Sequence, residues 1–209
     1  MTTIVVYVHG LWFTGREGFL LRRRVCAELG AVDHAFSYAS VTASMADNAA
    51  ALGAYLGKLR ADTIHLVGHS LGGVVILELF ENPPSLPPGR IVLLGSPLNG
   101  SRAARNFARL PLARKLLGRS IEDAVLQTRP RQWSGARELG VIAGARPLGL
   151  GRLVGLRGEP NDGTVAVAET ALPGATDRIV LPVSHSSMVF SAAVVDQTVS
   201  FLRAGRFVR

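Results

Sequence analysis

The stretch IHLVGHSLGGVV, residues 64–75, decides the fold. It contains the pattern G-x-S-x-G from Gly68 to Gly72, after an apolar run typical of a buried strand and before an apolar run typical of a helix. In that setting Ser70 stands on a sharp strand-to-helix turn, whose strained backbone holds the hydroxyl above the sheet. Gly68, Gly72 and Gly73 would let neighbouring backbone pass without a Cβ clash. We therefore predict that Ser70 is a nucleophile, beside a helix N-terminus that favours negative charge.

A second interpretation of residues 68–73 is a glycine-rich turn that binds phosphate. The stretch lacks the lysine of G-x-x-x-x-G-K-[ST] and the spacing of G-x-G-x-x-G, which favours the nucleophile. His69 lies inside the motif. We expect it to pack or to form a hydrogen bond rather than to act as a base, because a residue adjacent to Ser70 cannot easily reach the serine hydroxyl.

Around this stretch, short β-rich runs alternate with longer helical patterns, which is typical of a parallel sheet covered on both faces. Most of the β-rich runs are continuously apolar, as in strands buried on both sides. We predict an α/β fold with about six parallel strands and helices on both faces. The strands are expected at residues 4–9, 35–38, 63–68, 90–95, 140–145 and 178–183, and the helices at 18–29, 44–59, 71–80 and 191–203.

Residues 99–137 break this alternation. They are rich in arginine and leucine, contain Pro111 and Pro130, and predict two or three short helices that form a small lid or an irregular helical excursion. No repeat, low-complexity block or linker divides the sequence. We therefore expect residues 1–209 to form a single domain, which is long enough to bury a core without disulfides or metals.

The composition, with 48% hydrophobic and 18% charged residues, is typical of a soluble globular protein. No apolar run approaches the roughly 20 residues of a membrane-spanning helix. Met1 is followed almost at once by a β-branched run rather than by a secretory leader, so we expect a cytoplasmic protein. Cys26 is the single cysteine, and we expect it to be a buried structural thiol.

The net charge of +8 comes almost entirely from arginine, since Lys58 and Lys115 are the only lysines. The densest basic cluster, residues 22–24, is not interleaved with aromatic side chains. We expect a solvated basic face and no nucleic-acid partner. Peripheral contact with an anionic membrane stays open as an alternative, because positive charge attracts anionic surfaces.

A serine that attacks a carbonyl needs two hydrogen-bond donors aimed at the oxygen that becomes negative. One should be the backbone N–H of Leu71, directly after the nucleophile. The other should come from the loop after the first strand, which ends in VHGLW, residues 8–12. There Gly10 allows a close approach to Ser70, and Leu11 can present its N–H.

Trp12 and Phe13 follow in the same loop. They are candidates for the lining of an apolar substrate pocket, and the alternative is that they pack against the lid.

A base and its orienting carboxylate should follow in the order Ser, Asp or Glu, His. Of the five histidines, His185 alone comes after Ser70, and it falls in the loop after the last predicted strand. Asp162 lies in a turn after the fifth strand, where it could accept the ring N–H of His185. Asp177 and Glu159 are rivals, but Asp177 directly precedes the last strand, at the wrong end of the sheet.

With these residues identified, the sequence resembles the α/β-hydrolase superfamily, and within it the small bacterial lipases and esterases. The motifs follow the family's order along nearly the whole chain: HG at 9–10, GHSLG at 68–72, GSPLNGS at 95–101, NDGTV at 161–165 and HSSM at 185–188. The resemblance implies a minimal α/β-hydrolase fold, without the opening strands and extended lid of larger members. It also implies Ser70 as nucleophile, Asp162 as acid, His185 as base, and Leu11 and Leu71 as oxyanion donors.

We therefore expect a serine hydrolase that cleaves a small-molecule or lipid carboxylic ester through an acyl-enzyme, with no cofactor and no metal. A thioesterase or an acyltransferase would use the same residues. An alternative of another class is a non-catalytic scaffold that acts as a binding module. The complete set of candidate catalytic residues argues against it.

Overall fold

Six parallel strands form one sheet. The computed structural model describes residues 1–109, 113–121, 131–149, 156 and 158–209. Within them the strands lie in the order β2-β1-β3-β4-β5-β6, and every neighbouring pair is parallel. This confirms the predicted α/β fold. The strand bounds are β1 Thr3–Val8, β2 Val32–Phe36, β3 Thr63–His69, β4 Ile91–Leu94, β5 Leu139–Gly144 and β6 Asp177–Leu181.

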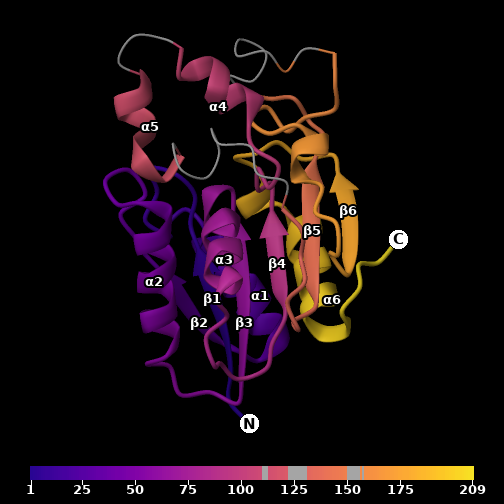
Figure 1. Ribbon diagram of the computed structural model, residues 1–209. Helices are drawn as coiled ribbons and strands as arrows, with labels where there is room; N and C mark the ends of the chain where they lie inside the picture. The colour runs from indigo at the N-terminus through magenta and orange to yellow at the C-terminus, as the bar shows by residue number, and fades with distance from the viewer. Residues whose placement is uncertain (110–112, 122–130, 150–155, 157) are drawn as a thin grey trace.

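Four helices cover the two faces of this sheet (Figure 1). On one face α1 (Phe19–Leu29) packs against α6 (Ala192–Ala204), and on the other α2 (Met45–Leu56) packs against α3 (Leu71–Glu81). Their positions confirm the four predicted helical patterns. None of the helices in the described part of the chain is long and apolar enough to cross a membrane.

Local sequence sets where these helices begin and end. The Ser44 hydroxyl accepts from the Asp47 N–H, and the Asp47 carboxylate accepts from the Ser44 N–H, so a capping box begins α2. Gly30 and Gly205 end α1 and α6 in the left-handed conformation, with φ of +62° and +70°. Both are positions at which glycine carries no steric penalty.

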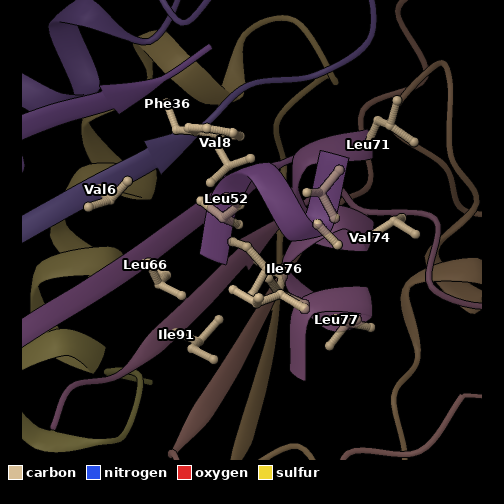
Figure 2. Close-up of a cluster of buried hydrophobic side chains, with 14 of the residues drawn as sticks. Val6, Val8, Phe36, Leu52, Leu66, Leu71, Val74, Ile76, Leu77 and Ile91 are labelled. Atoms are coloured by element: carbon tan, nitrogen blue, oxygen red, sulfur yellow. The ribbon is translucent and has the colours of Figure 1, made fainter. Parts of the chain in front are cut away.

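Buried apolar side chains fill the space on each side of the sheet. On one side Leu52 of α2 and Ile76 of α3 lie over Val6 and Leu66 of the central strands (Figure 2), and all four are 0% exposed. Successive residues of β1 point to opposite faces, so Tyr7 belongs to the cluster on the other side. Burial on both faces explains the continuous apolar runs in the sequence. The same packing holds α3, the helix that follows Ser70, against the sheet.

Strand β2 begins earlier than predicted, since the sequence predicts residues 35–38 and the strand spans Val32–Phe36. Its first residues, Val32 and Asp33, are exposed, and His34 is half-buried. The strand lies at the edge of the sheet and pairs with β1 alone. Because solvent reaches an edge strand, polar residues are tolerated in it, and a search for apolar runs misses them.

Two shorter helices, α4 (Arg102–Phe107) and α5 (Ala113–Ile121), lie beyond the end of the sheet toward which the strand arrows point (Figure 1). They belong to the predicted lid or excursion at residues 99–137, of which residues 110–112 and 122–130 lie outside the described residues. Two short 3-10 helices follow later in the chain, η3 Val167–Thr170 and η4 Met188–Phe190.

Cys26 lies in α1 and is buried, as predicted. Burial raises the pKa of its thiol to about 12. The thiol is therefore protonated at neutral pH and has the character of a structural residue.

Candidate active site

The turn between β3 and α3 holds Ser70 in a strained conformation, with φ +54° and ψ −122°. Non-glycine residues rarely adopt a positive φ, and such strain persists where the surrounding structure enforces it. Here the Ser70 N–H donates to the carbonyl of Leu94 at 2.8 Å, and the Ser70 carbonyl accepts from the Gly73 N–H at 3.1 Å. The turn thus places the serine at the carboxyl end of the central strands.

Three glycines make room for this turn, as the sequence predicts. A Cβ on Gly68 would lie 2.7 Å from the Cα of Gly73, inside any normal contact distance. A Cβ on Gly72 would collide with the carbonyl of Val8, and one on Gly73 with the side chain of Ser96. The beginning of α3 therefore approaches β1 and the end of β4 closely because these positions lack side chains.

The side chains of Ser70, His185 and Asp162 form a continuous chain of hydrogen bonds. His185 Nε2 lies 3.0 Å from Ser70 Oγ, and His185 Nδ1 lies 2.7 Å from Asp162 Oδ2. An ionised carboxylate only accepts, so Nδ1 carries the ring proton and Nε2 can accept the serine proton. Ser70 follows β3, His185 follows β6 and Asp162 lies in the connection from β5 to β6. The parallel sheet brings the three to its carboxyl end, although Ser70 and His185 are 115 positions apart.

The turn at residues 161–165 holds the Asp162 carboxylate in place. Its side chain is 0% exposed, and Oδ1 accepts from the N–H groups of Thr164 at 2.9 Å and Val165 at 2.7 Å. Gly163 is required beside it, because its φ is +94° and a Cβ there would collide with a neighbouring backbone carbonyl. Oδ2 is thereby left to face the imidazole.

The two rival carboxylates lie elsewhere. Asp177 begins β6, at the opposite end of the strand from the His185 loop, and forms an ion pair with Arg209 at 2.5 Å. Glu159 forms an ion pair with Arg102 of α4. Of the three carboxylates, the structure brings only Asp162 to the imidazole among the described residues.

Sequence reasoning passed over two glycines that make space for this carboxylate. A Cβ on Gly95, whose φ is +54°, would lie 3.0 Å from Asp162 Oδ2 and 2.9 Å from Met188 Sδ. A Cβ on Gly144 would lie 2.8 Å from Asp162 Cβ and 2.6 Å from Met188 Cε. Each glycine stands at the carboxyl end of a strand, β4 or β5, and that shared position is the signal that could have identified both.

The loop after β1 lies against the nucleophile. A Cβ on Gly10 would lie 3.1 Å from Ser70 Cβ. The Gly10 carbonyl accepts from His9 Nδ1–H at 2.7 Å and from the Phe13 N–H at 3.4 Å. In a trans peptide the N–H points opposite to the carbonyl, so these bonds also fix the direction of the Leu11 N–H. Its role as an oxyanion donor stays a prediction.

The second candidate donor, the Leu71 N–H, belongs to the first turn of α3. The first N–H groups of a helix have no partner within the helix and carry its positive dipole end. This location suits a donor that faces a developing negative charge.

His9 is fully buried, and burial lowers its pKa, which keeps the ring neutral. Its Nε2 accepts from the backbone N–H of Tyr38 at 3.2 Å, which leaves the proton on Nδ1 for the Gly10 carbonyl. Tyr38 follows β2, and no motif in the sequence connects it with this loop. Its part in the site becomes visible only when β1 and β2 are paired.

Trp12 and Phe13 lie at the surface, 59% and 49% exposed. Trp12 has a φ of +65°, and its N–H donates to Ser40 Oγ at 3.2 Å. The structure thus places both rings on the outside of the loop after β1, close in sequence to the candidate oxyanion donor. Their contribution to a substrate pocket stays a prediction.

This arrangement has the components that acyl transfer requires. A hydroxyl stands beside an imidazole nitrogen that can take its proton, and a buried carboxylate can stabilise the resulting imidazolium. The loop after β1 and the first turn of α3, which carry the two candidate oxyanion donors, lie beside the same serine.

A family model described as the alpha/beta hydrolase family matches residues 5–205. Among solved structures, the pyrethroid hydrolase PytH aligns with a TM-score of 0.68 at 16% identity, over 98% of each chain. Carboxylesterase CesB (YbfK) from Bacillus subtilis aligns at 0.58 and 15%, over 98% of this chain and 84% of its own. RedJ, the thioesterase of the prodiginine pathway in Streptomyces coelicolor, aligns at 0.58 and 15%, over 96% and 88%. At these identities the likeness shows the fold. No protein of curated function matches the sequence.

Proposed function

The chain belongs to the alpha/beta hydrolase family, and on that basis we propose that it is a serine hydrolase that cleaves carboxylic esters through an acyl-enzyme. The observation that carries the proposal is the hydrogen-bonded chain from Ser70 through His185 to Asp162. A strained serine at the head of a helix supports it, since strain of this kind accompanies function.

In the first half of the reaction, Ser70 Oγ attacks the ester carbonyl while His185 Nε2 takes the serine proton. The tetrahedral intermediate then collapses with loss of the alcohol, which receives that proton from His185. In the second half, water attacks the acyl-serine, His185 takes a proton from the water, and the acid leaves as Ser70 regains its hydrogen.

Charge stabilisation comes from both sides of the reacting carbonyl. The negative oxygen of the intermediate would accept from the N–H groups of Leu71 and Leu11. The positive imidazolium of His185 would face the buried carboxylate of Asp162, which also keeps the ring in the reactive tautomer.

The structural neighbours support an ester or a related acyl compound as the substrate. Their names include a carboxylesterase and a thioesterase, and both reactions use an acyl-serine. We propose a small-molecule or lipid ester as the substrate. Thioester hydrolysis is the related reaction that the assay below separates from ester hydrolysis.

The test is hydrolysis of p-nitrophenyl esters of increasing acyl length, beside an acyl-thioester series, by wild type, Ser70→Ala and Ser85→Ala. Ser85 is exposed and lies between α3 and β4, away from the carboxyl ends of the strands, so its variant is a matched control. We expect activity on esters that Ser70→Ala abolishes and Ser85→Ala leaves unchanged. A fluorophosphonate should label wild type and not Ser70→Ala.

Wild type that neither cleaves any ester or thioester nor reacts with fluorophosphonate would contradict the proposal and favour a binding module. Preference for thioesters, with labelling intact, would replace the ester by its sulfur analogue as the substrate.

A further inference from the structure

The backbone of His185 is held by two hydrogen bonds from other segments of the chain. Its N–H donates to the carbonyl of Asp162 at 2.8 Å. Its carbonyl accepts from Nε2 of His69 at 3.2 Å. These bonds run beside the side-chain bonds from Ser70 to His185 and from His185 to Asp162. The same three segments are therefore connected twice, once through side chains and once through the His185 backbone.

The tautomer of His69 follows from this contact. A carbonyl oxygen only accepts, so Nε2 of His69 carries the proton. Burial, and then the nearby His185 ring, lower the pKa of His69 to about 3, so the ring is neutral at physiological pH. The two rings lie with centroids 4.9 Å apart. A neutral donor adds no positive charge next to an imidazole that must itself become charged.

The other nitrogen of His69, Nδ1, is buried and has no hydrogen-bond partner within the described part of the chain. A buried polar atom without a partner has a desolvation cost that no hydrogen bond offsets. An apolar side chain of similar size would fill the same space without that cost. The hydrogen bond from Nε2 of the ring to the His185 carbonyl therefore accounts for a polar side chain at this position.

We propose that His69 is a positioning residue, whose Nε2–H fixes the His185 backbone and thereby aims the imidazole at Ser70 and Asp162. The inference rests on the proposed function in taking His185 as the base. It assigns a role to the residue before the nucleophile that is separate from packing.

Two bonds within the His185 loop show why such a contact matters. The Ser187 N–H donates to the Ser184 carbonyl at 3.1 Å, and the Ser184 N–H donates to Ser187 Oγ at 2.9 Å. Both bonds are internal to the turn, so they shape it without attaching it to the Ser70 turn. A displacement of about 1 Å in a catalytic group can lower the rate by about 100-fold.

Two substitutions separate the effect of the hydrogen-bond donor from the effect of filling the space. His69→Gln keeps an N–H donor at a position close to Nε2, whereas His69→Leu fills the space without a donor. With activity normalised to the fluorophosphonate-reactive fraction, we expect kcat to fall roughly 10- to 100-fold in His69→Leu with KM within about twofold of wild type. We expect His69→Gln to retain kcat within about threefold.

A second measurement is independent of turnover. The proton shared by His185 Nδ1 and Asp162 should give a far-downfield proton resonance, which Asp162→Asn removes and thereby assigns. We expect the resonance in wild type and His69→Gln, and its loss or broadening in His69→Leu while the thermal midpoint stays close to that of wild type.

A His69→Leu variant with wild-type kcat and an unchanged resonance would overturn the inference. So would a Gln variant as impaired as the Leu variant in both measurements, since the donor would then be irrelevant. If wild type cleaves no ester, the proposed function fails, but the resonance still decides whether His69 positions His185.

Discussion

The ring of Tyr38 stacks on the ring of His9, with centroids 4.2 Å apart and planes 16° apart, and the Tyr38 hydroxyl donates to the His9 carbonyl at 2.9 Å. Tyr38, two residues after the end of β2, thus fixes both the ring and the carbonyl of His9, the residue before Gly10. Since His9 in turn binds the Gly10 carbonyl, the orientation of the candidate oxyanion loop depends on a partner 28 positions away from it.

Tyr38→Phe keeps the stacked ring and removes the hydroxyl. We expect kcat for ester hydrolysis to fall roughly 3- to 10-fold with KM unchanged, because the oxyanion donors act on the transition state. Unfolding in urea should show a loss of about 1 kcal/mol for the buried hydrogen bond. Tyr55→Phe is the control, since its hydroxyl contacts His34, away from the oxyanion loop. Equal losses of kcat in the two variants would contradict this account.

Asp162→Asn should lower kcat/KM by about 10³- to 10⁴-fold, because an amide no longer stabilises the imidazolium or selects the reactive tautomer. The fold should persist, since the amide oxygen can still accept from the N–H groups of Thr164 and Val165. Asp177→Asn, at the other end of β6, should leave kcat unchanged. Steady-state kinetics of both variants decide the matter, and a loss below tenfold in Asp162→Asn would remove this residue from the mechanism.

The sequence alone predicted the order of strands and helices along the chain, because most strands are continuous apolar runs and the stretches between them have helical patterns. It also identified Ser70, Asp162 and His185 as candidates, because the turn chemistry around each is local. The glycines of residues 68–73, for example, are explained by backbone that passes within contact distance, and that crowding follows from the motif itself.

Residues that act across the sheet were not predictable in this way. Tyr38 reaches His9 only through the pairing of β1 with β2, and β2 was itself misplaced because polar residues occupy an edge strand. The packing of Gly95 and Gly144 around Asp162 depends on the registry of β4 and β5. Tertiary structure sets these contacts. For the two glycines the chain offers only their position at the carboxyl ends of strands, and for Tyr38 it offers no local pattern.

Gly163→Ala should destabilise the protein by about 3 kcal/mol or more, since a side chain there meets both a positive φ and the carbonyl of Leu148. Gly30→Ala provides the comparison. It has a positive φ of +62° but no atom within 4 Å of a new Cβ, so only the conformational cost of about 1–2 kcal/mol applies. Urea unfolding of the two variants measures the difference, and similar losses would show that the acid turn tolerates a side chain.

Stability should depend on pH through His65. Burial, with Arg90 and Arg137 nearby, lowers the pKa of His65 to about 4 from its ordinary 6.5. Between these values the unfolded chain binds a proton that the folded chain does not, so the free energy of unfolding falls as the pH falls from 6.5 to 4. The contribution of His65 over this window is about 3 kcal/mol.

His65→Asn tests this dependence. Nδ1 of His65 accepts from the Arg90 N–H at 2.9 Å, and the amide oxygen of asparagine can take over this role without titrating. We expect the difference in unfolding free energy between pH 7.5 and pH 4.5 to shrink in the variant. An unchanged difference would mean that other groups set the acid sensitivity.

Trp12 allows backbone strain and side-chain function to be separated. Its φ of +65° is costly for any side chain, and its ring is 59% exposed, so little core packing offsets the cost. Trp12→Gly relieves the strain and Trp12→Ala does not, so the Gly variant should be more stable than the Ala variant by about 1–2 kcal/mol.

Both variants lose the ring. If the ring contacts the acyl chain, KM for long p-nitrophenyl esters should rise roughly 3- to 10-fold in both, with no change for the acetate. Unchanged KM in both variants would instead show that the ring does not contact the substrate, and a rise in Trp12→Gly only would assign the effect to the backbone.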